Sequence, residues 1–503
     1  MSQYVLAHDL GTSGNKATLF DTDGRLIKST VYSYGLMTGE NGEAEQNADD
    51  WWKAVCETSR RLTAEIRRED VIAVSFSGQM MGCLCVDREG VPLHNALIWA
   101  DMRSTRQAAL LRERISAERY YAITGHRISA SDSITKLMWI RDNLPEVYEK
   151  TYKMLNAKDY IIYRLTGKFV TEPSDASSTC LLDLNTLDWS EEILSVSGLD
   201  KEKLPQLLSS VAVAGGITKE AAALTGLCEG TPVVCGGGDG CCAAVGTGIV
   251  KEGVANCCLG TSSWISFASK TPVCDKDMSV FNFAHIVPGY IMPCGTMQTG
   301  GGSLSWAVDT LYGTPAGNEA PSKDAIYRSV AEEVAASPMG AKGLFFLPYL
   351  MGERSPRWND KAKGAFLGLT MGHSRGDMLR AVMEGVGLNL DIILKIFRDS
   401  GADISRLILI GGGARNRIWQ KILCDVFGIP VLVPNYLEEA TSMGAAITAG
   451  VGVGAFADFG VIDKFIRIQE ENAPDPASHD YYRSRKALFD KAYFATEELF
   501  KTI

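Results

Sequence analysis

A four-residue motif occurs twice in this chain, once near its start and once near its middle. Residues 10–13 and 259–262 share the sequence Leu-Gly-Thr-Ser and lie 249 positions apart. Each copy stands between two apolar runs, so each predicts a tight turn that joins two strands. We therefore expect two related lobes and place the boundary between residues 1–249 and 250–503. A chain of 503 residues also exceeds what one hydrophobic core usually supports.

The composition excludes several classes of function. The net charge is -10 and basic residues form no stripe, so we expect no nucleic-acid partner. No apolar run reaches about 18 residues, and the first residues lack a charged segment followed by an apolar one, so we expect neither a membrane span nor a secretory signal. The 13 cysteines include no Cys-x-x-Cys pair, which favours reduced, buried thiols over a zinc site. We predict a cytoplasmic protein.

The first glycine turn has the composition of a phosphate site. Because it joins two strands, it differs from a P-loop and from a dinucleotide-binding fingerprint, in which a helix follows the glycines. The backbone N–H groups of such a turn can bind an anion, and Thr12, Ser13 and Lys16 would add hydroxyls and a positive charge. Asp9, at the end of the preceding strand, could hold hydrated Mg²⁺. The alternative is an ordinary β-turn without a ligand.

A single carboxylate lies inside the glycine-rich stretch 236–240. The stretch follows an apolar run and precedes small residues, which predicts a buried strand, a turn and a tightly packed helix start. Asp239 could cap the turn, which is common for Asp beside glycine. It could instead act as a base aimed at a bound hydroxyl, and this stretch alone leaves both readings open.

Polar side chains follow other predicted strands of the first half. Gln79, Trp99, Asp101 and Arg103 are residue types that bind polyols, by hydrogen bonding and ring stacking. The alternative is a helix start capped by Asp101 beside a Trp99 packed in the core. The polar segment 171–178 is expected to be a surface loop, and the alternative is that it borders the site.

Three segments of the second half carry glycines or small residues at predicted turns. Residues 298–306 predict a glycine turn that leads into a helix, and residues 411–416 predict a strand, turn and helix able to lie against a base or ribose. Residues 438–446 predict a helix start whose small residues either contact a ligand or only allow close helix packing.

Taken together, these motifs resemble the FGGY carbohydrate kinases, which belong to the actin-like ATPase superfamily. The resemblance spans nearly the whole chain and is carried by residues 8–14, 77–80, 236–239, 259–262, 348–356 and 411–416. It implies an α/β fold with two ribonuclease-H-like lobes and a cleft between them. Within the family the chain is most similar to the xylulokinases.

The resemblance implies ATP-dependent phosphorylation of a sugar hydroxyl, with a ketopentose as the expected acceptor. Asp239 matches the family's catalytic base and Asp9 the carboxylate that orients Mg²⁺, and both are expected near the metal. The expected nucleotide-binding residues are Gly11, Thr12, Ser13, Lys16, Gly260, Thr261, Gly301, Gly412 and Asn416. The expected sugar-binding residues are Gln79, Met80, Met81, Trp99 and Asp239. A homodimer is expected by family analogy alone.

The chain departs from the xylulokinase pattern close to the expected sugar. Met81 stands where xylulokinases have His, Gly240 where they have Asn, and Ala100 where they have Asn. Hydrogen bonds to sugar hydroxyls determine specificity, so these changes put D-xylulose itself in question. Other candidate acceptors are a polyol such as erythritol or glycerol, or a signalling sugar. A non-catalytic ATP switch of the actin or Hsp70 type, or a sugar sensor, is the alternative from another class.

Overall fold

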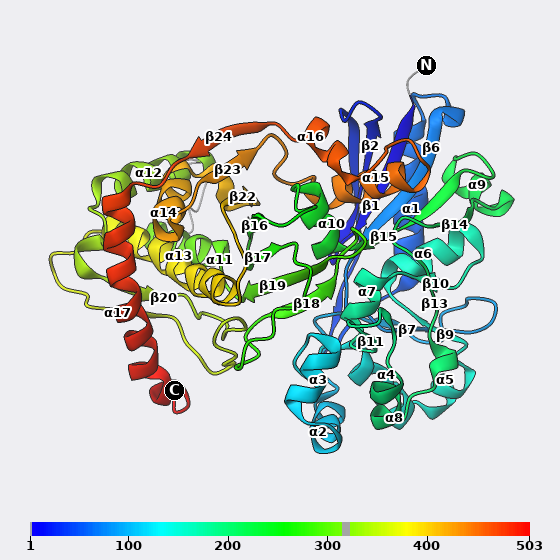
Figure 1. Ribbon diagram of the computed structural model, residues 1–503, viewed down its shortest axis with the longest axis horizontal. Helices are drawn as coiled ribbons and strands as arrows, with labels where there is room; N and C mark the ends of the chain where they lie inside the picture. The colour runs from blue at the N-terminus through cyan, green and yellow to red at the C-terminus, as the bar shows by residue number, and fades with distance from the viewer. Residues whose placement is uncertain (1–2, 314–321) are drawn as a thin grey trace.

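The computed structural model describes residues 3–313 and 322–503, which form two lobes, each built on one mixed β-sheet (Figure 1). The strands of the first sheet are, in spatial order, β14 (Val213–Gly216), β15 (Pro232–Gly238), β6 (Val71–Gly78), β1 (Tyr4–Leu10), β2 (Gly14–Asp21) and β3 (Leu26–Ser33). The strands of the second sheet are β18 (Phe281–Ala284), β19 (Ile291–Met297), β17 (Ser263–Phe267), β16 (Val254–Leu259), β22 (Arg406–Ile410), β23 (Val431–Pro434) and β24 (Ile468–Asn472).

The two sheets share one arrangement of strands. β1 pairs antiparallel with β2 and parallel with β6, and β16 pairs antiparallel with β17 and parallel with β22. The next strands, β15 and β23, are again parallel, and antiparallel strands β14 and β24 lie beyond them. The repeated motif forms the same turn in each sheet, between the first two strands of each lobe. The α/β fold with two related lobes, expected from the sequence, is confirmed.

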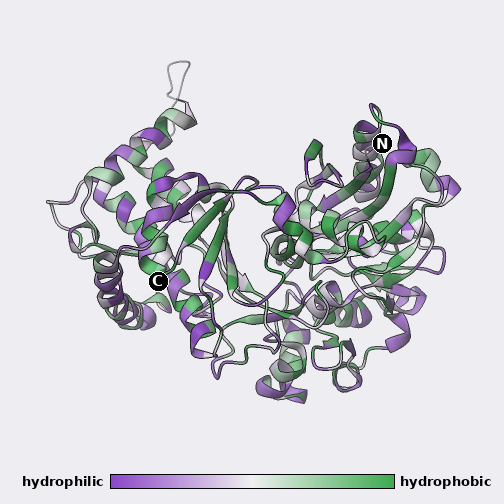
Figure 2. Cartoon of the chain, turned by 45° about the horizontal axis from the view of Figure 1, so that its top comes forward, coloured by the Kyte–Doolittle hydropathy of each residue, from purple (hydrophilic) through white to green (hydrophobic). Residues whose placement is uncertain are grey.

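Helices cover both sheets and connect their strands. The helices that precede β15 are α1 (Ala48–Thr63), α2 (Thr105–Arg114), α3 (Ala117–Thr124), α4 (Ser133–Asn143), α5 (Pro145–Lys150), α6 (Ala157–Thr166), α7 (Pro173–Ser178), α8 (Glu191–Ser197) and α9 (Lys219–Thr225). Later helices include α11 (Gly301–Tyr312), α12 (Lys323–Ala336), α13 (Arg375–Asp399), α14 (Arg417–Phe427), α16 (Ile462–Phe465) and α17 (Pro476–Phe500). The central strands of both sheets are mostly hydrophobic, whereas the edge strand β24 and the surface helix α17 carry many polar residues (Figure 2). Among the described residues, no helix has the length and apolarity needed to cross a membrane.

One helix of the second half packs on the first sheet. α15 (Ala440–Gly452) follows β23 along the chain, yet it lies against β1, β6 and α10 (Asp239–Gly246) (Figure 1). The two helices approach closely because glycines face the contact: a Cβ on Gly246 would lie 1.8 Å from Ala440 O, and one on Gly444 would lie 1.9 Å from Cys242 O. The small residues of 438–446 therefore do allow close helix packing, as one of the two readings expected.

We predict that Gly444→Ala lowers the melting temperature of the protein. The added methyl group would overlap Cys242 O, and overpacking of this kind costs about 1–3 kcal/mol. Gly35→Ala is the matched control, because no atom lies within 4 Å of an added Cβ there. Differential scanning calorimetry of both variants tests this, and an unchanged melting temperature for Gly444→Ala would contradict the packing.

Candidate active site

Two carboxylates lie at the same edge of the first sheet. Asp9 on β1 is level with Ser77 on β6, and Ser77 is level with Gly237 on β15. β15 carries a bulge at Gly236, which has φ 73°, and a Cβ there would lie 2.0 Å from Phe76 O. Only glycine fits this position. The strand ends at Gly238, and Asp239 begins α10, so parallel strand ends bring both carboxylates to one edge.

Asp9 is held from two sides by hydroxyl groups. Ser77 Oγ donates to Asp9 Oδ1 at 2.8 Å, and Thr441 Oγ1 on α15 donates to Asp9 Oδ2 at 2.7 Å. Burial raises the pKa of Asp9, and the hydrogen bonds from Thr441 and Ser77 and the charge of Lys16 oppose that shift. Each carboxylate oxygen keeps a lone pair for a further partner.

Asp239 is partly exposed at the start of α10. Its Oδ1 accepts a hydrogen bond from Gly240 N at 2.7 Å. Burial, and then the charge of Asp9, raise the pKa of Asp239 to about 7. Burial, and to a smaller degree the charge of Asp239, raise the pKa of the Cys294 thiol on β19, so Asp239 lies near the second sheet as well. A carboxylate with a pKa near neutrality is suited to accept a proton from a hydroxyl.

The first glycine turn is tied to the segments around it. Gly11 N donates to Gly14 O at 3.0 Å, and Thr12 Oγ1 accepts from Trp99 Nε1 at 2.8 Å. Ser13 is exposed. Trp99 is 41% exposed, so the reading of a packed core tryptophan is wrong. The structure therefore places Trp99, expected at the sugar, directly beside the expected phosphate turn.

Lys16, expected at the phosphates, has acidic partners on the segment before α15. Its Nζ donates to Glu438 O at 3.0 Å and forms an ion pair with Glu439 Oε1 at 3.2 Å. Arg415 Nη2 forms an exposed ion pair with Glu438 Oε1 at 2.7 Å. These contacts join the first turn to the segment that follows β22, although more than 390 positions separate them along the chain.

The expected sugar-binding residues after β6 differ in exposure. Gln79 is buried, and its Nε2 donates to Gln46 Oε1 at 2.7 Å. Met80 is also buried and packs against the turn that precedes Asp239, since a Cβ on Gly238 would lie 2.6 Å from its side chain. Met81 is partly exposed and has φ 62°. Of these three residues, Met81 is the one with a side chain partly open to solvent.

The backbone of Met81 is fixed on both sides. Its N–H donates to Ser178 Oγ at 3.1 Å, and its carbonyl accepts from the buried amine of Lys136 at 2.8 Å. Such bonds offset the cost of a left-handed backbone at a residue other than glycine. The loop that carries Met81 is therefore held rigidly by α4 and α7.

Asp101 and Arg103 form an ion pair with each other and are not free to bind a polyol. Asp101 is fully buried, and Arg103 Nη2 lies 2.7 Å from its Oδ2 and 2.7 Å from Glu45 Oε1. Asp101 Oδ2 also accepts from Ala44 N at 2.8 Å. This pair therefore supports the loop that bears Trp99, and the reading of both residues as polyol ligands is not supported by the geometry.

The second glycine turn packs against the start of α11. Gly301 N donates to Gly260 O at 2.7 Å, and a Cβ on Gly301 would lie 2.5 Å from that oxygen. Asn416 caps α14, with its Oδ1 accepting from Ile418 N and Trp419 N, both at 3.0 Å. The turn after β22 and the start of α14 thus face the second glycine turn.

All five residues expected at the nucleotide in the second half line one cavity of about 860 Å³. They are Gly260, Thr261, Gly301, Gly412 and Asn416. Leu304, Ile418 and Trp419 add apolar surface, and Arg417 and Ser305 add polar groups. A large cavity with an apolar lining and a few convergent polar groups is typical of a small-molecule site.

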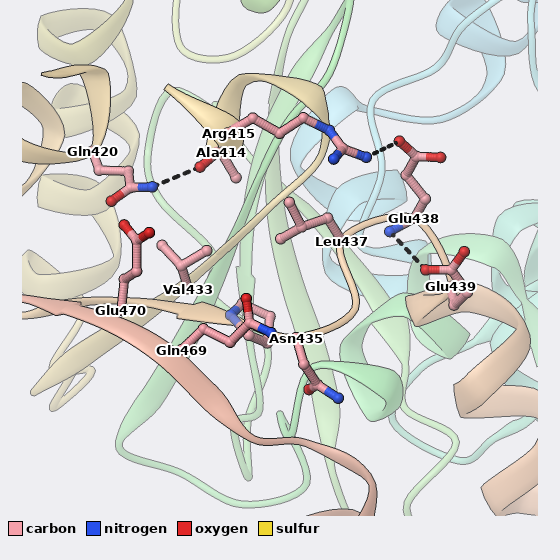
Figure 3. Close-up of a pocket in the computed structure, with 11 residues that line it drawn as sticks. Ala414, Arg415, Gln420, Val433, Asn435, Leu437, Glu438, Glu439, Gln469 and Glu470 are labelled. Atoms are coloured by element: carbon pink, nitrogen blue, oxygen red, sulfur yellow. Dashed lines mark hydrogen bonds and ion pairs between the residues drawn. The ribbon is translucent and has the colours of Figure 1, made fainter. Parts of the chain in front are cut away.

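A smaller cavity of about 290 Å³ adjoins this one through Arg415, which lines both (Figure 3). In Figure 3 the Arg415 side chain reaches toward Glu438, and Glu439 lies on the far side of Glu438 from it. Glu470 also lines this cavity, so its polar lining carries an acidic excess. An acidic cavity repels phosphate, so of these two adjoining cavities the larger, glycine-lined one is the candidate nucleotide site.

Sequence reasoning missed residues that complete the site from a distance. Thr441 lies in the small-residue run at the start of α15, but no pattern links it to Asp9, 432 positions away. The segment 171–178 is largely the buried helix α7 and not the expected surface loop. Ser and Asp are usually exposed, so their composition suggested a surface position.

The fold and the site define a two-lobed protein with paired carboxylates on the first sheet and a small-molecule cavity on the second. The model for the FGGY family of carbohydrate kinases, N-terminal domain, matches residues 4–246, and the model for the C-terminal domain matches residues 255–453. The chain therefore belongs to the FGGY family of carbohydrate kinases.

Curated relatives and solved structures resemble the chain over almost its entire length. The xylulose kinase of Bacillus subtilis (strain 168) is 32% identical over 500 residues, covering 99% of this chain and 98% of the relative. The gluconokinase of Bacillus licheniformis is 31% identical, covering 97% and 95%. The ligand-bound xylulose kinase from Lactobacillus acidophilus has a TM-score of 0.92 at 27% identity and covers 99% of both chains. The chain is an ATP-dependent sugar kinase similar to xylulose kinases.

The raised pKa of Asp239 predicts a pH-dependent change in stability. Its pKa is higher in the folded than in the unfolded chain, so folding favours the protonated form and stability falls as pH rises from about 4 to about 7. Asp239→Asn removes the charge and should stabilise the ligand-free protein by about 1 kcal/mol or more at about pH 8, and by clearly less at about pH 5. Melting temperatures at both pH values test this. An equal difference at the two values would contradict the raised pKa.

Proposed function

We propose that this kinase transfers the γ-phosphoryl group of ATP to a hydroxyl of a small ketose or polyol, with Asp239 as the general base. The observation that carries the proposal is the position of Asp239 at a parallel strand end beside Asp9, partly exposed and with a pKa near 7. Deprotonated Asp239 would accept the hydroxyl proton as the oxygen attacks the γ-phosphorus in line.

ATP would place its nucleoside in the cavity of about 860 Å³. The glycine cradle supports this placement, because a Cβ on Gly301 would collide with Gly260 O and close the approach to the backbone. The phosphates would reach from Thr261 in the second turn toward Thr12, Ser13 and Lys16 in the first. For Lys16 to bind phosphate, its ion pair with Glu439 has to open or be shared.

Mg²⁺ would be held by Asp9 and Asp239 together with the phosphates of ATP. The described residues contain no cluster of three or more His, Cys, Asp or Glu side chains able to hold a metal. A kinase Mg²⁺ fits this finding, since one or two carboxylates, substrate phosphates and water usually hold the ion. When bound, Mg²⁺ would offset negative charge that develops on the phosphates. Thr441 and Ser77 would keep Asp9 oriented.

The acceptor is proposed to be a ketopentose, or a related polyol bound in a less polar pocket than in xylulose kinases. Gly240 leaves open space, since the nearest heavy atom to a Cβ placed there is Met292 Cε at 3.7 Å. Met81 replaces a hydrogen-bonding side chain at a second of the three departures. Erythritol, glycerol, gluconate and a signalling sugar are alternative acceptors, and gluconate is suggested by the gluconokinase relatives.

We also propose a cytoplasmic location and a homodimer, the latter by family analogy. The boundary between residues 249 and 250 remains a prediction. It lies between the family models, which end at residue 246 and begin at residue 255. Sedimentation equilibrium of the purified protein tests the dimer, and a single monomer mass would contradict it.

Asp239→Asn should lower sugar phosphorylation by about 10²- to 10⁴-fold, because an amide cannot accept the proton. The affinity for ADP should stay within about threefold of the original, since the nucleotide cavity lies on the second sheet. The matched control is Asp188→Asn on β12 (Asp188–Trp189), whose Oδ1 also accepts a neighbouring backbone N–H at 2.7 Å.

The same measurement distinguishes a sugar kinase, in which Asp239 is the general base, from a non-catalytic ATP switch. Coupled assays of ADP release with a panel of ketoses and polyols give the transfer rate, and calorimetry gives the ADP affinity. Full phosphorylation by Asp239→Asn would disprove the role of Asp239 as base. A wild-type protein that hydrolyses ATP equally with and without every sugar would favour the non-catalytic switch or sensor.

The combined change Met81→His and Gly240→Asn should raise kcat/KM for D-xylulose by about tenfold, because each restores a hydrogen-bonding group. Both positions suit the new residues: histidine is enriched among the non-glycine residues that adopt positive φ, and Gly240 has room for a side chain. Met102→His, at an exposed methionine, is the control. If D-xylulose turnover does not improve, these two positions do not set the specificity.

A further inference from the structure

The short helix α7 lies beside β18 where the two lobes meet (Figure 1). Its three serines, Ser174, Ser177 and Ser178, are fully buried. Each hydroxyl donates within its own segment: Ser174 Oγ to Glu172 Oε1, Ser177 Oγ to Ser174 O and Ser178 Oγ to Asp175 O, all at 2.7 Å. Because the single hydroxyl proton is used in this way, each oxygen presents its remaining lone pairs outward.

Each of these oxygens accepts a backbone N–H from a different part of the molecule. Ser174 Oγ accepts from Gly238 N at 3.0 Å, and Gly238 immediately precedes Asp239. Ser178 Oγ accepts from Met81 N at 3.1 Å, in the loop after β6. Ser177 Oγ accepts from Ala284 N at 3.2 Å, at the end of β18 in the second sheet.

A buried cluster of one lysine and three carboxylates holds the start of α7 in place. Lys158 on α6 is fully buried, and its Nζ lies 2.6 Å from Asp159, 3.3 Å from Asp175 and 3.5 Å from Glu172. The buried amine is not left as an unpaired charge, which would destabilise the fold, because three buried carboxylates surround it. Glu172 also accepts from Ser210 Oγ at 2.6 Å. Glu172, whose carboxylate accepts the hydrogen bond from Ser174 Oγ, therefore has little freedom to move.

We propose that α7 is a positioning element for catalysis, in which Ser174 sets the catalytic turn and Ser178 sets the sugar loop. Ser177 ties both to the second sheet. Ser174 and Ser178 do not touch the reacting atoms. Ser174 acts through the backbone before Asp239, and Ser178 acts through the backbone of Met81. The inference rests on the proposed role of Asp239 as base.

The two serines should have separable kinetic effects. Ser174→Ala leaves Gly238 N without its partner, so the turn shifts and kcat should fall by about 10- to 100-fold, with the sugar KM within about threefold. Ser178→Ala frees the backbone of Met81, so the sugar KM should rise by about fivefold or more, with kcat within about threefold. Ser174→Thr keeps the hydroxyl and should restore at least part of kcat.

The control is Ser197→Ala, a fully buried serine on α8 whose hydroxyl donates to Leu194 O at 3.1 Å within its own helix. It should change neither kcat nor KM. ADP affinity, measured by calorimetry, reports whether the second lobe of each variant is folded. The experiment uses the full-length protein, the best acceptor from the sugar panel and saturating ATP with Mg²⁺.

Three results would overturn the positioning role. One is that Ser174→Ala and Ser178→Ala keep wild-type kcat and KM; another is that both lower kcat and raise KM to the same degree. The third is loss of ADP binding in Ser174→Ala, which would make the hydroxyl a requirement for folding. Asp239→Asn in the same assay separates the two proposals: if it is inactive while both serine variants are normal, the base stands and the positioning role fails.

Discussion

The site depends on the parallel alignment of three strand ends in the first sheet. Asp9, Ser77 and Gly237 are level on β1, β6 and β15, and neighbouring strands are about 4.8 Å apart, so the backbones of Asp9 and Gly237 are about 10 Å apart. This spacing brings the two carboxylates near each other without direct contact. Burial, and then repulsion from Asp9, raise the pKa of Asp239, and the rest of the structure must offset the cost of holding the two carboxylates so close.

That offset comes from segments far apart in the sequence. α15 leaves the second sheet and returns to the first, where Thr441 donates to Asp9 and the glycine contacts pack α15 against the middle and end of α10, the helix that begins with Asp239. α7 holds the backbone just before Asp239 from the other side. The second sheet supplies the glycine-lined cavity, so each lobe contributes a different part of one reaction.

The sequence was sufficient to predict the duplicated hairpin turn, the two α/β lobes and the family, because glycine turns and apolar runs are local signals. The five second-half residues that line one cavity were expected from the family resemblance, which their glycine-turn motifs carry in part. Contacts over long separations were not, as Thr441 with Asp9 shows. Polar composition was misleading at residues 171–178, because paired charges around Lys158 allow a helix rich in Ser and Asp to be buried. Asp101 was misleading for a related reason, since Arg103 already satisfies it.

The most direct test of this account is a crystal structure of the kinase with its best acceptor and a non-hydrolysable ATP analogue. The account predicts that a carboxylate oxygen of Asp239 lies about 2.6–3.2 Å from the acceptor hydroxyl, with the nucleoside in the cavity between Gly260 and Asn416. A structure in which another side chain contacts that hydroxyl, and Asp239 hydrogen-bonds only to Gly240 N as it does here, would contradict it.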